Sequence, residues 1–242
     1  TICYSTPIQT IKIDYSTRYH LAVQIGLDHL SYCLTNKKTN NIEYFKNFNM
    51  DNDIISLINK EEILKRDFGS VSVAYIKFEN TLIPNKFFEK KNLKQILDFN
   101  TKRHDIIKYD KLSTIDAHLI YSIPKAMQDI VFTFFPTALQ KANESILIDQ
   151  FSRFENKHHN AYLYINNNTI TITIFKNKKL ILSNKFNFET AADILYFTLF
   201  TFEQLKINTE TVHTKLYGEI IKGDENHQLL YEYIRNIEFG SR

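Results

Sequence analysis

Glycine is scarce in this sequence. Only five glycines occur among its 242 residues, whereas an average protein contains roughly 7% glycine. Loops that cradle phosphate groups generally need glycine, because the backbone must approach the phosphate closely and often with a positive φ. A nucleotide site would therefore have to use one of a few positions, which are Gly26, Gly69, Gly218, Gly223 and Gly240.

Cysteine is scarcer still, with only Cys3 and Cys33 in the chain. Two cysteines cannot build a disulfide framework, and they are too few for a cysteine-based zinc site. Cys33 falls within an alternating, strand-like segment, so we expect it to be a small buried apolar side chain. The low cysteine content favours a reducing, cytoplasmic location.

Long apolar runs and a strong charge imbalance are also missing. No segment reaches the run of about 18 apolar residues that a membrane span needs, and no signal peptide is visible. The net charge is only +3 and the basic residues are scattered, so we expect no nucleic-acid binding. The sequence starts at Thr1 without a methionine, which leaves open whether residues precede it.

The second half of the chain contains a clear β-pattern. In residues 169–175, TITITIF, isoleucine alternates with threonine, which predicts a strand with one face on the core. Thr190 and Asp193 form a capping-box pattern ahead of a helix that is apolar around most of its circumference and should be deeply buried. The predicted elements are strands 161–165, 169–175 and 180–188, helix 191–205, strand 212–217 and helix 225–235.

The first half has a similar order of elements. Two strands within 19–35 surround a Gly-Leu-Asp turn, and a third strand follows at 42–48. Asp51 is the expected N-cap of a helix that ends at Gly69, and a strand covers 71–78. Residues 80–113 look less regular and contain Pro84, which is unfavourable in a central strand. Within this segment the sequence predicts a helix at 92–99 and a short strand at 106–112. The remaining predictions are a strand at 117–123 and helices at 124–135 and 143–154.

Both halves therefore read strand, strand, strand, helix, strand, over residues 19–78 and 160–217. Three antiparallel strands followed by a helix and a parallel strand form the core of a ribonuclease-H-like unit. Two such βββαβα units in tandem make the actin-like ATPase architecture, an α/β fold, and this step is an analogy at the level of the fold. We expect the first half to cover residues 1–135, with an irregular insertion near 80–113, and the second to cover 136–242.

Several segments, taken together, resemble a bacterial family known as domain of unknown function 3822. These are LAVQIGLDHLSYCL (21–34), SVAYIKFENTLIP (72–84), ETAADILYFTLFTFEQLKIN (189–208), LYGEI (216–220) and YEYIRNI (231–237). The resemblance covers nearly the whole chain, although no single motif is chemically specific. It implies an actin-like fold akin to the cytoplasmic actin-like parts of pilus and secretion assemblies, and it implies no known activity.

Actin-like ATPases hold ATP between their halves, with an Asp-x-Gly hairpin turn from each half. The acid serves the metal ion and the glycines allow close backbone contact with the phosphates. Here the first turn reads Gln24-Ile25-Gly26-Leu27, with Asp28 one residue further on. The acid is thus replaced by a neutral side chain, and the same replacement excludes a ribonuclease-H-type two-metal nuclease.

The second turn departs further from the ATPase pattern. It reads Tyr164-Ile165-Asn166-Asn167-Asn168-Thr169, with tyrosine at the acid position and asparagines in place of glycines. Asparagine tolerates left-handed backbone, so part of the geometry could survive. A third segment has one glycine, Gly218, where a pair is usual. The residues that would contact a nucleotide, if one binds, are Gly26, Leu27, Asp28, Asn166, Asn167, Asn168, Thr169 and Gly218.

These observations predict no catalytic residues, no metal site and no cofactor. The leading hypothesis is a non-catalytic binding or scaffold protein with a degenerate actin-like ATPase fold and an unidentified protein partner. Alternatives are a nucleotide-binding switch that holds ATP and magnesium, or a subunit of a pilus-like or secretion-like envelope assembly. A homodimer is a further option.

Overall fold

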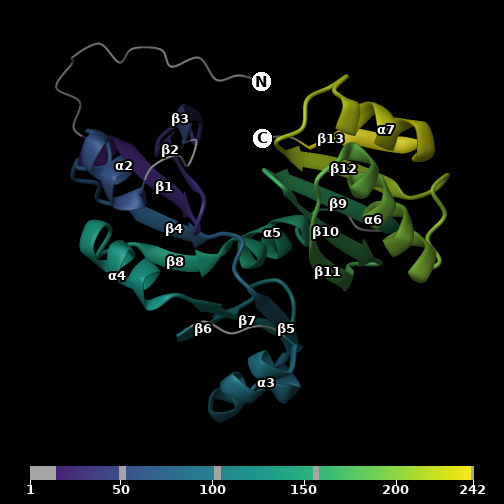
Figure 1. Cartoon of the computed structure of the whole chain (residues 1–242), viewed down its shortest axis with the longest axis horizontal. Helices are drawn as coiled ribbons and strands as arrows, with labels where there is room; N and C mark the ends of the chain where they lie inside the picture. Colours follow the sequence, from purple (N-terminus) through teal and green to yellow (C-terminus); the bar gives the residue numbers. More distant parts are fainter. Residues whose placement is uncertain (1–14, 49–52, 101–104, 155–157, 241–242) are drawn as a thin grey trace. The chain divides into compact units, whose positions relative to one another are not determined.

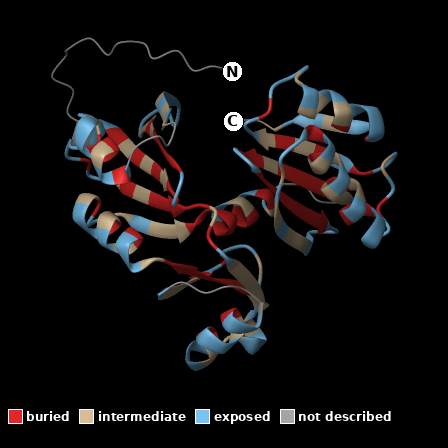
Figure 2. Cartoon of the chain, in the orientation of Figure 1, coloured by how far each residue is buried: buried red, intermediate tan, exposed pale blue. Residues whose placement is uncertain are grey.

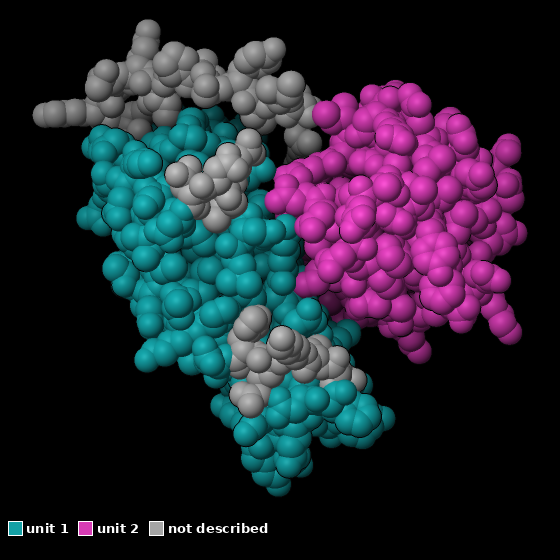
Figure 3. Space-filling model, viewed as in Figure 1, with its two compact units in different colours: residues 1–112, 116–146 teal, residues 113–115, 147–242 magenta. Residues whose placement is uncertain are grey.

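The computed structural model describes residues 15–48, 53–100, 105–154 and 158–240. Cys3 and the expected N-cap Asp51 lie outside these ranges. The chain divides into two compact units (Figure 3). The first unit comprises residues 1–112 and 116–146, and the second comprises 113–115 and 147–242.

The first unit is built on a five-stranded sheet with the order β3-β2-β1-β4-β8 (Figure 1). After the short helix α1 (Tyr15–Arg18), β1, β2 and β3 form an antiparallel meander, and β4 then pairs in parallel with β1. Helices α2 and α4 pack apolar residues on one face of this sheet. The bounds are β1 Tyr19–Ile25, β2 Leu30–Asn36, β3 Ile42–Phe48, α2 Ile54–Lys60, β4 Val71–Tyr75, α4 Lys125–Phe134 and β8 Leu139–Ala142.

The second unit repeats this design in its five-stranded sheet, which has the order β11-β10-β9-β12-β13. The antiparallel strands β9, β10 and β11 again precede a helix, α6, and β12 pairs in parallel with β9. The equivalent strand order confirms the predicted tandem repeat. The bounds are β9 His159–Asn166, β10 Thr169–Lys176, β11 Lys179–Asn187, α6 Ala191–Gln204, β12 His213–Gly218, α7 Glu225–Tyr233 and β13 Asn236–Phe239.

The segment expected to be an irregular insertion, 80–113, contains the helix and the short strand that the sequence predicted within it. With β7 it forms a three-stranded sheet of order β5-β7-β6 and a helix, α3. Pro84 ends the edge strand β5, a position where proline removes no ladder hydrogen bond. The bounds are β5 Asn80–Pro84, 3-10 turns η1 Asn85–Phe87 and η2 Lys90–Asn92, α3 Leu93–Asn100, β6 Ile106–Lys111 and β7 Ala117–Ile123.

Helix α5 (Asn143–Phe151) carries the chain from the first unit into the second. The first unit extends to Ile146, beyond the division after Phe135 drawn from the sequence, because β8 pairs in parallel with β4. The loop 113–115 belongs to the second unit. Asp149 Oδ1 holds it by accepting hydrogen bonds from Ser113 N at 2.8 Å and Thr114 Oγ1 at 3.0 Å.

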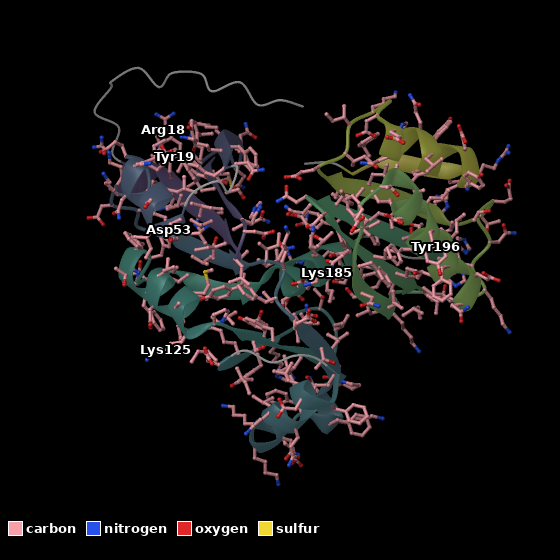
Figure 4. All side chains as sticks on the ribbon, in the orientation of Figure 1. Arg18, Tyr19, Asp53, Lys125, Lys185 and Tyr196 are labelled. Carbon is pink, nitrogen blue, oxygen red and sulfur yellow. The ribbon has the colours of Figure 1, made fainter. Side chains whose placement is uncertain are left out.

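Local signals in the sequence predicted some helix ends and misplaced others. The capping box of Thr190 and Asp193 is present at the start of α6. Helix α2 begins after Asp53, labelled in Figure 4, whose side chain accepts a hydrogen bond from Ser56 N. Its C-cap is Glu61, so the prediction that the helix ends at Gly69 is wrong. Residues 61–70 form turns there instead.

Helix α6 is less buried than its composition predicted. Ile194 and Phe202 pack in the core of the second unit, but Tyr196 is 59% exposed and Phe200 is 44% exposed. Their rings stack on each other with centroids 5.8 Å apart, which reduces the apolar area that each presents to water. The expectation of a deeply buried helix is therefore wrong for this flank of α6.

The prediction that β10 has only one face on the core is also wrong. Its isoleucines contact the core beneath α6 and α7, while Thr171 and Thr173 on the opposite face are buried as well. Helix α5 supplies the cover, because Phe151 stacks on Tyr162 of β9 at 4.5 Å between centroids. Figure 2 shows strands of the second unit buried along much of their length, whereas β1 alternates between buried and partly exposed residues.

We predict that Phe151→Ala destabilises the second unit by about 3–5 kcal/mol, because the substitution removes a fully buried ring and leaves a cavity. The matched control is Tyr196→Ala, which removes an exposed aromatic ring from the same unit and should cost about 0.5 kcal/mol or less. Urea unfolding followed by circular dichroism measures both. Equal losses would contradict the role of α5 as the cover of this sheet.

Candidate functional site

The two hairpin turns expected to carry a nucleotide lie at equivalent positions in their units. Ile25 at the end of β1 pairs with Tyr75 of β4, and Ile165 near the end of β9 pairs with Gly218 of β12. Each turn therefore lies beside the carboxyl end of a parallel strand, where ligands commonly bind in α/β sheets. The two pairings align the strands of the two units with each other. In this alignment Gln24 is equivalent to Tyr164, Gly26 to Asn166 and Ile76 to Glu219.

The first turn is closed by contacts within the protein. Gly26 N donates a hydrogen bond to His29 O at 2.8 Å, and Ile76 N donates one to Ile25 O at 3.0 Å. A Cβ atom on Gly26 would lie 2.8 Å from the carbonyl oxygen of Ile76. The need for glycine here is therefore explained by the close approach of the neighbouring strand end. Leu27 at the tip is 60% exposed.

The acidic residue of this turn, Asp28, is paired with a basic residue from the following strand end. Lys77 Nζ lies 3.0 Å from Asp28 Oδ2. Lys77 adopts a positive φ of 65°, which turns the chain back towards the hairpin after β4. Asp28 thus pins the turn to the chain after β4, and the sequence pattern did not point to Lys77.

The equivalent of the catalytic acid, Gln24, is part of a neutral hydrogen-bond network. Its Nε2 donates to Asn143 Oδ1 at 3.1 Å, and its Oε1 accepts from Ser31 Oγ at 3.3 Å. Both hydrogen-bonding ends of the amide are therefore engaged within the first unit. A carboxylate could not make the donor contact to Asn143, so the site is suited to an amide.

The second turn carries a carboxylate where a phosphate would be expected. Asn167 has a φ of 48° and its backbone N–H donates to Glu219 Oε2 at 2.7 Å. Thr169 Oγ1 donates to Asn166 O at 3.0 Å, and Asn168 O accepts from Phe188 N at 2.9 Å. The N–H at the tip of the turn, the donor that an anionic ligand would use, is thus occupied by a side chain of the same unit.

Gly218 places Glu219 against this turn. Gly218 has a φ of +86°, and a Cβ atom on it would lie 2.0 Å from Ile165 O. The same carbonyl accepts a hydrogen bond from Glu219 N at 2.8 Å. A side chain at position 218 would push β12 away from β9 and displace the carboxylate. The signal for Glu219 was present in LYGEI, since it directly follows the expected glycine, but sequence reasoning did not assign it a role.

Metal-binding clusters and membrane-spanning helices are two further features that could indicate a function in the described parts of the chain. Within residues 15–48, 53–100, 105–154 and 158–240, no group of three or more His, Cys, Asp or Glu side chains could hold a metal ion. No helix in these ranges is both long enough and apolar enough to cross a membrane.

The model of a protein family described as "Protein of unknown function (DUF3822)" matches residues 8–237. The chain belongs to the DUF3822 family. This confirms the resemblance drawn from the segments between residues 21 and 237. No curated protein matches the sequence.

Solved structures establish the fold of this DUF3822 protein as the actin-like ATPase fold. A Bacteroides thetaiotaomicron protein with that fold and unknown function is similar over 94% of this chain and 93% of its own, with 21% identity and a TM-score of 0.81. The PilM–PilN type IV pilus biogenesis complex matches with 9% identity and a TM-score of 0.61, over 92% and 88% of the two chains. The cytoplasmic domain of Vibrio cholerae EpsL, an inner-membrane component of the type II secretion system, matches with 8% identity and a TM-score of 0.55, over 93% and 90%.

We predict that Gly218→Ala destabilises the protein by about 1–3 kcal/mol more than Gly223→Ala. Both glycines have a positive φ, of +86° and +89°, but only Gly218 has backbone atoms against the position of a Cβ. Gly223→Ala therefore measures only the cost of a positive φ in alanine, about 1–2 kcal/mol. The additional loss of stability in Gly218→Ala measures the clash with Ile165. Thermal unfolding of the two variants measures it, and equal midpoints would contradict the assigned role of Gly218.

Proposed function

We propose that this DUF3822 protein is a non-catalytic binding or scaffold protein, which uses the actin-like ATPase fold without binding or hydrolysing ATP. The observation that carries the proposal is the hydrogen bond from Asn167 N to the Glu219 carboxylate. A phosphate would have to displace a charged group held by the fold itself. The proposal also assigns no nucleotide-binding role to Gly26, Leu27, Asp28, Asn166, Asn168, Thr169 or Gly218.

Electrostatics favours this interpretation. Two like charges about 4 Å apart repel by about 1 kcal/mol in water and by about 4 kcal/mol at the effective dielectric constant near a protein surface. A phosphate beside Glu219 would experience such repulsion. A magnesium ion could offset it, but the positions of the usual acids hold Gln24 and Tyr164, whose side chains are neutral. The amide of Gln24 is already engaged with Ser31 and Asn143.

We propose protein binding as the function of this chain. One of the similar structures, PilM, is in a complex with PilN, and another, EpsL, is a component of a secretion system. Both are less than 10% identical to this chain, so they support only the point that this fold serves in protein assemblies. We propose a protein partner for this chain and a cytoplasmic location, with no cofactor.

Isothermal titration calorimetry with Mg·ATP tests the proposal directly. We predict no saturable binding with a Kd below about 1 mM, which corresponds to about −4 kcal/mol. The variant Glu219→Gln should also fail to bind, because removing one negative charge does not restore the missing acids. Saturable binding of Mg·ATP by the unmodified chain at a Kd of about 1 µM would overturn the proposal and favour the nucleotide-switch alternative.

A further inference from the structure

The two sheets differ in the face that lies opposite their main helices. We call this face of the first sheet the open face. It consists of the side chains that alternate with the core residues of β1, β2 and β4: His20, Ala22, Gln24, Ser31, Cys33, Thr35, Ser72 and Ala74. Six of these eight residues are partly exposed, although they lie on strands that have neighbours on both sides.

The equivalent face of the second sheet is covered. Its central residue Tyr162 is 1% exposed and Phe175 is 0% exposed. Phe151 of α5 stacks on Tyr162, and its ring centroid also lies 5.0 Å from that of Tyr217. One helix thus completes the second unit through aromatic contacts with its sheet.

Matching strand positions show what the first sheet has in place of these aromatic rings. Ala22 occupies the position of Tyr162, Thr35 that of Phe175, and Ala74 that of Tyr217, as the pairing registers of the two sheets define them. Small side chains thus stand at these three positions of the open face, where Ala22 and Thr35 are partly exposed and Ala74 is buried. Large apolar side chains stand at its two edges, with Phe45 of β3 45% exposed and Leu139 of β8 77% exposed. Phe45 pairs with Cys33 and Leu139 with Ser72, so both belong to this face.

The polar groups of the open face already have partners within the protein. His20 Nδ1 lies 2.7 Å from Ser70 Oγ, and His20 Nε2 lies 2.8 Å from Ser72 Oγ. Burial lowers the pKa of His20, with a further contribution from Lys37, and this favours the neutral ring, which has one donor and one acceptor nitrogen. Gln24 is bonded to Asn143 and Ser31. Covering this face would therefore leave no hydrogen bond unmade at these residues, and burying them costs little.

We propose that the open face is the docking surface for an amphipathic α-helix of a partner protein, which takes the place on the first sheet that α5 takes on the second. This inference rests on the proposed function, protein binding, and names the surface and the kind of partner. The helix should carry its own large apolar side chains, because the small side chains of Ala22 and Ala74 supply none. Phe45 and Leu139 would flank it, with their exposed apolar surface buried in the complex.

Cys33 lies on this surface as a free, partly exposed thiol and provides a direct test. The full chain carrying Cys3→Ser has Cys33 as its single cysteine. This chain is expressed in the cells that naturally contain the protein, and alkylation of Cys33 by a maleimide is timed in the isolated chain and in its native complex. We expect alkylation to be at least about tenfold slower in the complex, as for a residue at the centre of an interface.

A maleimide–benzophenone reagent attached to Cys33 then identifies what lies over it. We expect photocrosslinks to a protein segment whose apolar residues recur at helical spacing. Phe45→Ser and Leu139→Ser replace exposed side chains and should each weaken co-purification of that protein by about tenfold. Tyr196→Ser, which removes an aromatic ring of intermediate exposure (59%, against 45% for Phe45 and 77% for Leu139) from the second unit, is the matched control and should change nothing.

The outcomes separate the two proposals. If a protein co-purifies but Cys33 reacts as fast as in the isolated chain, the docking surface is wrong while protein binding stands. A crosslink to a segment with strand periodicity, or to nucleic acid, would also contradict the proposal that the partner binds as an α-helix. If no protein co-purifies with the unmodified chain, both the docking surface and the proposed function fail.

Discussion

Both units depend on the packing of apolar side chains between a sheet and the helices on one of its faces. Helices α2 and α4 supply this packing in the first unit, and α6 and α7 supply it in the second. On the other face the units diverge. The second sheet places Tyr162 and Tyr217 against Phe151 of α5. The first sheet places Ala22 and Ala74 at the same positions, and its polar residues pair among themselves.

The two hairpin turns are held by side chains of opposite charge, although they occupy equivalent positions in the repeat. In the first unit the end of β4 contributes a cation, Lys77, which pairs with Asp28 of the turn. In the second unit the end of β12 contributes an anion, Glu219, which accepts from the turn backbone. The ion pair is largely exposed on its Asp28 side and contributes about 1 kcal/mol or less. Each of these two contacts fastens one turn to the sheet of its own unit.

The repeat could be predicted from the sequence because its strands and helices carry strong periodic signals, such as TITITIF and the capping box at Thr190. The fifth strands, β8 and β13, escaped prediction because four residues are too few to display a period. Periodicity also cannot show which apolar face lacks a neighbour, so the exposure of Tyr196 and the second cover over β10 were both missed. In the two hairpin turns, the sequence already shows that Gln24 and Tyr164 stand where the ATPase pattern has an aspartate. Glu219 and Asn167 are 52 residues apart, and their contact depends on the pairing of β12 with β9. No local sequence pattern contains that pairing.

The hold of Asp149 on the loop 113–115 has a consequence for the order in which the protein folds. The second unit is not a continuous segment, because this loop precedes its anchor by 36 residues, with the rest of the first unit between them. During synthesis the first unit can therefore complete its sheet as soon as β8 emerges. The loop must wait for α5 to extend past residue 149 before its backbone N–H groups find their acceptor. Formation of α5 thus links the folding of the second unit to a peptide made well before it, and a fragment that begins at residue 147 would lack that part of its own structure.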